Sequence, residues 1–553
     1  MWQQCYLLFG HSLSLSCAIA ALPVLTLVIL LGWLRKPAWI ASPCGLAVAF
    51  LVAVFAYRMP VSIAISAAAH GAAFAIFPIL WVIFWAIALF RVTVETGQSE
   101  IIKISIGRLT PDPRLQMLLI AIAFAGFLEG AAGFGAPVAI AATMLVGLGF
   151  SAFNASAACL LANTAPVAFG SIGIPLLTLA LITGLPVNKL GVATAAICLP
   201  VAIIIPVYIM LAMGGRRATR GIWTPMLVCG LVFGTMQWLV ARFIGPQLTD
   251  ILAAIATIAA LIVVIRLRRQ PAEFDLAFPT RSLDGEALQV AAPVALHPSH
   301  PDPTPAQVFR AWSPYGVLVL CVLLWGWKPL AIHLDIPTIT FPWPWLHDAV
   351  LRMPPIVKAP SPYHAIFAFN WLAASGTACL VATVVSALML GLSPRKFLHV
   401  LLSVARQLLL PAVVMTSVMG IAFVMNYSGA TATLGLAFAA TGAAFPFFSA
   451  LLGWFGVFLT GSDTSANALF GTLQTVTATH LGFSPILMAA ANSGGGVMGK
   501  MISLQTIAIA AGATGLSQQE QSRLFRFTLR HSIVLAAFTG LVVLVLAYAG
   551  KLV

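Results

Sequence analysis

Long apolar runs dominate the chain, and short polar segments separate them. Most runs hold about 20 residues, the length that an α-helix needs to cross the hydrocarbon core of a bilayer. The first run, from about Ser12 to Leu34, lacks the basic segment and small-residue cleavage site of a signal peptide, so we expect it to remain a spanning helix. The pattern predicts an all-α polytopic membrane protein with about 12–14 transmembrane helices.

The composition excludes a soluble protein. Hydrophobic residues make up 61% and charged residues 8% of the 553 positions, with a mean hydropathy of +1.03, which is more apolar surface than a soluble core needs. The net charge of +14 could suggest nucleic acid, but Lys and Arg stand at the ends of apolar runs and form no basic stripe. We therefore expect these charges to orient the protein in the lipid bilayer, and we expect no nucleic-acid partner.

The sequence holds no motif for cofactor chemistry. Its eight cysteines form no Cys-x-x-Cys pair and lie mostly in apolar segments, so we interpret them as small buried residues. A Walker loop, a haem motif and a metal-ligand constellation are all missing from the sequence. The prediction is therefore no cofactor, no metal and no enzymatic activity, which argues against an ATP-driven pump and a redox subunit.

A duplication divides the chain. Phe127 begins the segment Phe-Leu-Glu-Gly, and Phe458 begins Phe-Leu-Thr-Gly at an offset of 331 positions (458 minus 127). Nearly the same offset recurs in further pairs, which are Trp39 with Trp371, Pro78 with Pro411, Gly149-Phe150 with Gly482-Phe483, Asn163-Thr164 with Asn492-Ser493, and Thr183 to Leu185 with Thr514 to Leu516.

The matched pairs predict a division into six parts. These are an N-terminal transmembrane helix (1–37), a first repeat (38–214), linking transmembrane helices (215–266), a Pro-rich cytoplasmic loop (267–311), a transmembrane helix with an external loop (312–369) and a second repeat (370–553).

Basic residues predict that the two repeats are inverted. Arg35 and Lys36 place the end of the first helix in the cytoplasm, as do Lys103, Arg108 and Arg114 for the turn after Glu95, whereas the matching turn 427–449 carries no charge. Conversely, the turn 183–189 has one Lys, and its counterpart 516–531 has three Arg. The charge bias swaps sides between the copies, and both termini then face outward.

Two carboxylates interrupt uncharged apolar segments. Glu129 and Asp463 stand alone in this way, whereas other acids such as Asp250 fall in loops or at segment ends. An ionised carboxylate at the centre of a membrane helix costs about 2.5–3.5 kcal/mol, so it should be protonated, paired or lined by water. We predict that Glu129 and Asp463 carry the coupling proton; the alternative is a neutral carboxyl that hydrogen-bonds neighbouring helices.

Small residues surround both carboxylates and predict helix breaks. In a membrane, broken backbone is tolerated inside protein or beside a water-filled cavity, where its free N–H groups can bind an anion. We therefore expect a re-entrant hairpin in each repeat, although close helix packing through small residues is an alternative. Lys500 is the expected countercharge, unless it extends to the membrane interface. The predicted substrate-binding residues are Gly130, Gly133, Gly135, Asn163, Thr164, Gly461, Ser462, Thr464, Ser465, Asn492, Ser493 and Lys500.

Long stretches of the chain resemble the bacterial L-lactate permease family. The resemblance covers essentially the whole chain and is carried by Arg114 to Met117, Phe127 to Ile140, Asn163 to Gly170, Phe458 to Ser465 and Gly499 to Ser503. It implies a multi-pass carrier of the bacterial inner membrane that takes up L-lactate, and also D-lactate and glycolate, with protons. It further implies kinship with the ion transporter superfamily, whose members have inverted repeats, paired re-entrant hairpins and often an elevator-type motion.

The match to that superfamily is partial at two points. Sodium-coupled dicarboxylate members carry Ser-Asn-Thr at their hairpin tips, whereas Ala162 and Ala491 precede the Asn-hydroxyl pairs here. Asn370 stands where lactate permeases are expected to have Asp. A sodium-coupled carboxylate symporter of the same fold and an anion channel stay open as alternatives. The sequence also leaves open the preferred 2-hydroxy acid, the proton stoichiometry, the gating hairpin and whether the protein forms a homo-oligomer.

Overall fold

A computed structural model describes residues 1–8, 12–34, 36–133, 135–267, 303–357 and 359–550. Arg35 and most of the predicted loop at 267–311 lie outside the described residues. Within the described part, twelve helical stretches are long and apolar enough to cross a membrane, or thirteen if the bent pair Ala152–Ala162 and Val167–Thr183 counts as one span. The prediction of a polytopic helical membrane protein with about 12–14 spans is confirmed by length and composition.

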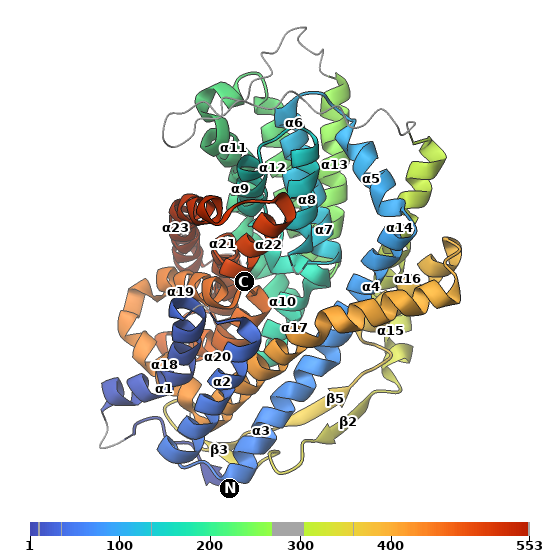
Figure 1. Cartoon of the computed structure of the whole chain (residues 1–553). Helices are drawn as coiled ribbons and strands as arrows, with labels where there is room; N and C mark the ends of the chain where they lie inside the picture. Colours follow the sequence, from blue (N-terminus) through green and yellow to red (C-terminus); the bar gives the residue numbers. More distant parts are fainter. Residues whose placement is uncertain (9–11, 35, 134, 268–302, 358, 551–553) are drawn as a thin grey trace.

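The first part of the chain is helical after a short strand (Figure 1). Its elements are β1 (Trp2–Gln3), α1 (Leu13–Leu27), η1 (Val28–Trp33), α2 (Ala38–Leu51), η2 (Val52–Ala56), α3 (Val61–Phe74), η3 (Ala75–Leu80), α4 (Trp81–Glu95), α5 (Gln98–Gly107), α6 (Pro113–Met117), η4 (Leu118–Phe124), α7 (Ala125–Ala131), α8 (Ala136–Gly147), α9 (Ala152–Ala162), η5 (Val167–Phe169), α10 (Gly170–Thr183) and α11 (Val187–Thr219).

The remaining elements include four further short strands. They are α12 (Trp223–Phe243), α13 (Thr249–Leu267), α14 (Pro305–Gly326), α15 (Lys328–Asp335), β2 (Ile339–Pro342), β3 (Val350–Arg352), β4 (Ser361–Pro362), β5 (Ile366–Phe369), α16 (Ser375–Met389), α17 (Pro394–Ser428), α18 (Ala430–Phe438), η6 (Ala439–Ala444), α19 (Phe445–Thr460), α20 (Asp463–Leu481), α21 (Pro485–Lys500), α22 (Leu504–Thr514) and α23 (Gln518–Ala549).

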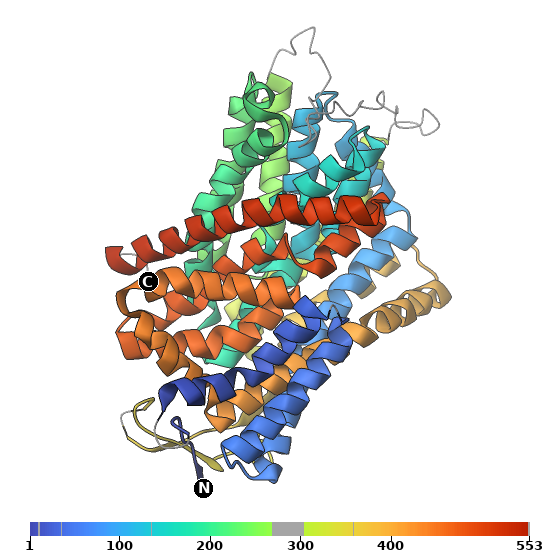
Figure 2. The same ribbon diagram turned by 60° about the vertical axis from the view of Figure 1, so that its left-hand side comes forward.

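The order of elements from α2 to α11 recurs from α16 to α23. In both runs a long helical stretch with a proline near its middle, Pro78 or Pro411, precedes a short helix. Two helices that meet at a glycine break follow, then an interrupted pair and a long final helix. In Figure 2 the last helices of the chain, coloured orange to red, lie across the green and teal helices of the first run.

The expectation of an all-α fold is wrong in detail, because residues 339–369 form small sheets. Strand β1 pairs in parallel with β3, β3 pairs antiparallel with β4, and β2 pairs antiparallel with β5. Strand β2, Ile-Thr-Phe-Pro, and strand β5, Ile-Phe-Ala-Phe, are rich in β-branched and aromatic side chains, which suit a sheet, and Pro342 ends its strand.

The predicted Pro-rich loop also ends earlier than expected, since α14 starts at Pro305 rather than after residue 311. Thr304 caps this helix in a capping box with Gln307, and Pro305 occupies the first turn. A proline there starts a helix because the missing N–H has no intrahelical partner in any case. The proline count alone therefore overstated the length of the loop.

The N-terminus and the small sheets meet at one end of the molecule (Figure 1). Gln4 Nε2 donates to the carbonyls of Asn426 and Tyr427 at 2.9 Å, and Tyr427 Oη donates to the His364 carbonyl at 3.3 Å. These contacts join β1, the end of α17 and the segment before β5. The placement of the N-terminus and the 332–364 segment on the outer side of the membrane stays a prediction.

Candidate functional site

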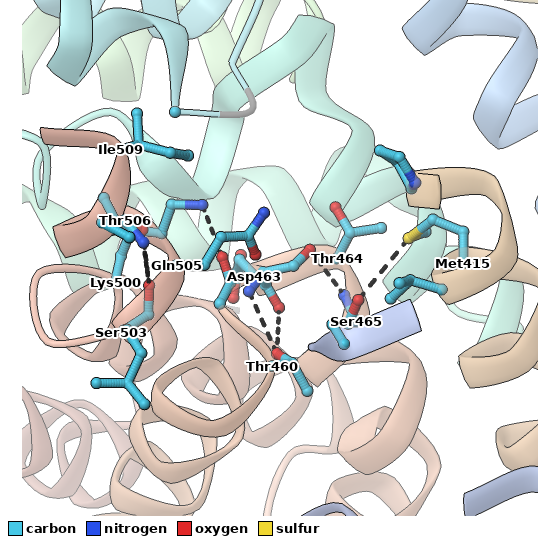
Figure 3. A pocket seen from close by; sticks show the side chains of 18 of the residues that line it. Met415, Thr460, Asp463, Thr464, Ser465, Lys500, Ser503, Gln505, Thr506 and Ile509 are labelled. Carbon is cyan, nitrogen blue, oxygen red and sulfur yellow. Dashed lines mark hydrogen bonds between the residues drawn. The ribbon is translucent and has the colours of Figure 1, made fainter. Parts of the chain in front are cut away.

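The site is built around a cavity of about 720 Å³ that helix ends surround (Figure 3). Its wall includes the start of α2, the middle of α17, the break between α19 and α20, the end of α21 and the start of α22. Eight of the residues predicted from the sequence line this cavity, namely Glu129, Gly135, Gly461, Ser462, Asp463, Thr464, Ser465 and Lys500.

Asp463 is positioned by the break between α19 and α20. Helix α19 ends at Thr460 because Gly461 takes a left-handed conformation with φ +72°, which favours glycine. Ser462 then caps α20, and its Oγ accepts a hydrogen bond from the Ser465 N–H at 3.3 Å. Asp463, in the first turn of α20, is buried at the cavity wall.

The Asp463 carboxylate is held by α20 and α21. Its Oδ2 accepts a hydrogen bond from Ser493 Oγ at 2.5 Å and a longer one from Asn467 Nδ2 at 3.4 Å. Its Oδ1 has no hydrogen-bond partner among the described residues. One carboxylate oxygen is therefore available to a ligand.

A chain of buried, hydrogen-bonded side chains extends from this carboxylate. Its members are Asn467, Asn492, Gln474 and Ser449. Asn492 Nδ2 donates to Asn467 Oδ1 at 2.9 Å, and Gln474 Nε2 donates to Asn492 Oδ1 at 3.1 Å. Ser449 Oγ donates to Gln474 Oε1 at 2.7 Å. The chain joins α19, α20 and α21 and fixes their mutual positions, because each buried group depends on its neighbour for a partner.

The two predicted Asn-hydroxyl pairs occupy different places. Asn163 caps the end of α9 and Thr164 begins the break after it, whereas Asn492 and Ser493 lie inside the continuous helix α21, seven or more residues before its end at Lys500. Neither pair lines the cavity. Ser493 reaches the site through Asp463, and direct substrate binding by these pairs stays a prediction.

Glu129 enters the cavity from the end of α7. Every residue of the most apolar window of the span Pro113–Ala131 is buried inside the protein, so this carboxylate faces protein rather than lipid. A methyl group on Gly170 would lie 2.8 Å from Glu129 Oε1, which shows how closely the start of α10 approaches it. Glu129 Oε2 is buried without a hydrogen-bond partner among the described residues.

The predicted glycines near Glu129 divide by position. Gly135 lines the main cavity, whereas Gly133 lines a second cavity of about 320 Å³ that shares Ile87 and Gln407 with the first. Gly130 lines neither, since a Cβ there would lie 2.8 Å from the Asp250 Cβ. Gly130 therefore permits close packing of α7 on α13, and its predicted role in substrate binding has no support from this placement.

Lys500 ends α21 at the cavity. Its Nζ donates to the Gly461 carbonyl at 2.8 Å, so the side chain reaches the break between α19 and α20. The ammonium group interacts electrostatically with both Glu129 and Asp463, although it forms a close ion pair with neither among the described residues. Two carboxylates and one ammonium group therefore share one cavity.

Helix N-termini add positive potential to this cavity. The first residues of α20 and the Ser503 to Thr506 segment at the start of α22 line it, as does Gly135 before α8. In Figure 3, Lys500, Ser503 and Thr506 lie on one side of Asp463, and Ser465 lies on the other. The unpaired N–H groups at helix starts favour an anion, and the Ser and Thr hydroxyls can bind its polar atoms.

The sequence analysis missed a third buried carboxylate, Asp250. We predicted that this acid lies at a segment end, and it does lie in the first turn of α13. It is nevertheless almost fully buried, which its position in the sequence did not indicate. Gln237 Nε2 donates to Asp250 Oδ1 at 3.0 Å. The signal in the sequence was an isolated Gln in one apolar run and an Asp directly before the next.

Among the described residues, one group of metal-type side chains lies outside this cavity. His347, Asp348 and His364 each offer a ligand atom within 4.8 Å of the others, in the segment that holds the sheets. Asp348 Oδ1 lies 2.6 Å from His364 Nδ1. We predicted no metal site, and the pattern could not be seen in the sequence because sixteen positions separate Asp348 and His364.

Comparisons with known proteins agree over the whole chain. A family model described as L-lactate permease matches residues 16–550. The chain is 41% identical to the glycolate permease GlcA of Escherichia coli (strain K12), covering 99% of this chain and 98% of that protein. It is also 41% identical to the L-lactate permease of the same strain, with the same coverage, and to the L-lactate permease of Bacillus subtilis (strain 168), covering 97% and 96% of the two chains.

Proposed function

The chain belongs to the L-lactate permease family, and we propose that it takes up L-lactate, and also D-lactate and glycolate, by proton symport across the bacterial inner membrane. The protein is a multi-pass membrane protein and a transporter rather than an enzyme. One observation carries the proposal: Glu129, Asp463 and Lys500 line a single cavity inside the membrane-spanning part.

The cavity suits a small anion. Its volume of about 720 Å³ corresponds to roughly two dozen water molecules, so a monocarboxylate fits with part of its hydration shell. Lys500 and the N-termini of α20 and α22 attract the carboxylate. The hydroxyls of Ser462, Thr464 and Ser503 can donate to it or to the 2-hydroxyl group that lactate and glycolate share.

Charge balance explains why protons travel with the substrate. With lactate bound, three carboxylates face one ammonium group, and each unbalanced charge that crosses the bilayer costs about 2.5–3.5 kcal/mol or more. Protonation of Glu129 and Asp463 removes two of these charges and leaves the substrate paired with Lys500. In this mechanism, the two acids bind protons where lactate binds and release them where it leaves.

We further propose inverted repeats and an elevator-type motion. Support comes from the recurring element order and from Gly135, before α8, and Gly461, after α19, which line the same cavity. Lys36 and Gln521 line the cavity, and the charge bias places both on the cytoplasmic side, so we assign this conformation as inward-facing. Assembly into a homo-oligomer stays a prediction.

Uptake of labelled lactate into proteoliposomes tests the proposal. We expect accumulation under an inward proton gradient without sodium, collapse on adding a protonophore, and competition by unlabelled glycolate. Uptake that requires sodium at fixed pH would identify a sodium symporter instead, and electrogenic flux without accumulation would identify a channel.

Variants of the two acids then test coupling. Glu129→Gln and Asp463→Asn should each abolish proton-driven accumulation while lactate exchange at equal pH continues. Asp335→Asn, at an exposed carboxylate of the external helix α15, is the matched control and should accumulate lactate like the unchanged protein. Normal accumulation by Glu129→Gln would remove Glu129 from the mechanism.

A further inference from the structure

Behind Glu129, away from the cavity, the end of α7 packs against the first turn of α13. Gly130 follows Glu129 directly, and a Cβ on Gly130 would lie 2.8 Å from the Asp250 Cβ and 3.0 Å from the Ile251 N atom. The Glu129 and Asp250 carboxylates are close enough to repel each other when both are ionised. Of these two acids, Glu129 lines the cavity and Asp250 does not, so Asp250 lies in a second layer of side chains behind the cavity wall.

Gln237 of α12 bridges the parts of this layer by hydrogen bonds. Its Nε2 donates both to Asp250 Oδ1 at 3.0 Å and to the Ala165 carbonyl at 2.9 Å. Ala165 lies in the break after α9, next to Asn163 and Thr164. One amide group therefore joins α12, α13 and the break that carries Asn163, whose side chain lies beside Glu129.

Four side chains of this layer have buried oxygen atoms without a hydrogen-bond partner among the described residues. The atoms are Glu129 Oε2, Asp250 Oδ2, Asn163 Oδ1 and Gln237 Oε1. The side chains are almost completely buried, with exposed fractions of 4%, 1%, 2% and 0% in the same order. Buried polar atoms normally have partners, and two of these four belong to carboxylates, for which burial without a partner is most costly.

We infer that Glu129 and Asp250 share a buried site for a small monovalent cation, with Asn163 and Gln237 supplying further oxygen ligands. Carboxylate and amide oxygens bind hard cations, and a single positive charge, whether a proton or a sodium ion, relieves the repulsion between the two acids. The inference rests on the proposed transport function and adds Asp250 as a coupling residue.

The position of this site connects the cation to the substrate. Glu129 faces the cavity at Gly170 on one side and contributes to the second layer on the other. When lactate occupies the cavity, its negative charge adds to that of Glu129 and favours a cation between Glu129 and Asp250. By linkage, the bound cation then favours lactate to the same extent.

Transport by the Asp250→Asn variant tests the inference. In proteoliposomes, the unchanged protein and the variant are compared under a proton gradient without sodium and under a sodium gradient at equal pH. Without a membrane potential, a tenfold gradient supports about tenfold accumulation of lactate for each coupled cation. We expect the variant to lose this accumulation, to a ratio of about one, while lactate exchange without an ion gradient stays measurable and shows that the variant is folded. The gradient that drives the unchanged protein identifies the cation as a proton or as sodium.

Accumulation by Asp250→Asn equal to that of the unchanged protein, with the same ion dependence, would overturn the inference and leave the proposed symport intact. Uptake of lactate that only sodium drives, or no gradient-driven uptake at all, would overturn the proposed proton symport; in the second case, lactate binding to the purified protein at varied pH and sodium concentration tests the shared site. Binding that responds to neither ion, or equally in both proteins, overturns the shared site. If Asp250→Asn does not fold, Gln237→Leu removes the bridging amide without changing a charge, and the same loss of accumulation is expected.

Discussion

Replacement of Gly495 by alanine tests how the site is held in shape. Helices α19 and α21 cross at this glycine, and a Cβ there would overlap the Ala450 carbonyl oxygen and lie 2.6 Å from the Ala450 Cα. Carbon atoms need about 3.5–4.0 Å, and neither backbone can rotate away, so the two helices would separate by about 1 Å. Gly495 is two residues after Ser493, whose 2.5 Å hydrogen bond to Asp463 would lengthen beyond the usual limit.

Replacing Gly495 and replacing Gly316 by alanine should change the free energy of unfolding in opposite directions. Overpacking costs about 1–3 kcal/mol, whereas alanine in a helix gains about 0.5–1 kcal/mol over glycine, so Gly495→Ala should lower the free energy of unfolding by up to about 2.5 kcal/mol. Gly316 lies within α14, and a Cβ there would meet nothing within 4 Å. Gly316→Ala should therefore leave stability unchanged or raise it by up to about 1 kcal/mol.

Thermal unfolding in detergent and lactate uptake in proteoliposomes measure both effects. We expect a lower melting temperature for Gly495→Ala than for Gly316→Ala, together with uptake reduced about tenfold or more, because a shift of about 1 Å at a binding site is enough for such a loss. Equal melting temperatures and normal uptake for the two variants would refute the tight crossing of α19 and α21.

Three further predictions concern single side chains. Lys500→Met removes the ammonium group that donates to the Gly461 carbonyl, so the KM for lactate should rise at least tenfold; an unchanged KM in uptake assays would exclude Lys500 as the countercharge. Gly170→Ala places a methyl group 2.8 Å from Glu129 Oε1, which lies at the end of a flexible side chain and can move aside. We therefore expect an altered pH profile of uptake and an unchanged melting temperature. A large loss of stability instead would contradict this geometry. Burial raises the pKa of Tyr6, which lies outside the membrane-spanning helices. The neutral Tyr6 hydroxyl therefore stabilises the fold fully below its ordinary pKa of 10.0, and this contribution is lost as the pH rises further. Tyr6→Phe should make the fall in melting temperature between pH 9 and about 11 less steep, and parallel curves for the two proteins would contradict this prediction.

Much of the site's local framework was predictable. The lone acids Glu129 and Asp463, the glycine breaks beside them and Lys500 are visible as departures from an apolar pattern, and the structure brings all three charged groups to one cavity. Such departures are readable because a charge in a membrane segment carries a cost that only an internal site relieves.

Other parts could not be predicted from local patterns. Asp250 has the sequence position of an ordinary helix start, and only the packing of α13 on Gly130 buries it. Asn492 resembles a residue at a helix break, yet it lies within α21 and binds Asn467 and Gln474. The small sheets were missed because strand pairing joins β1 to β3, which are far apart in the chain.

The sequence by itself therefore determined that this is a multi-pass membrane protein, that helices break at the glycines beside Glu129 and Asp463, and that these two acids stand alone in apolar surroundings. These properties depend on hydropathy and backbone preferences over a few neighbouring residues. Only the tertiary structure decided which acids meet, that Lys500 reaches Gly461 and that Gln237 joins Asp250 to the break beside Asn163. Those contacts join residues far apart in the chain, and the packing of all the helices together sets their distances.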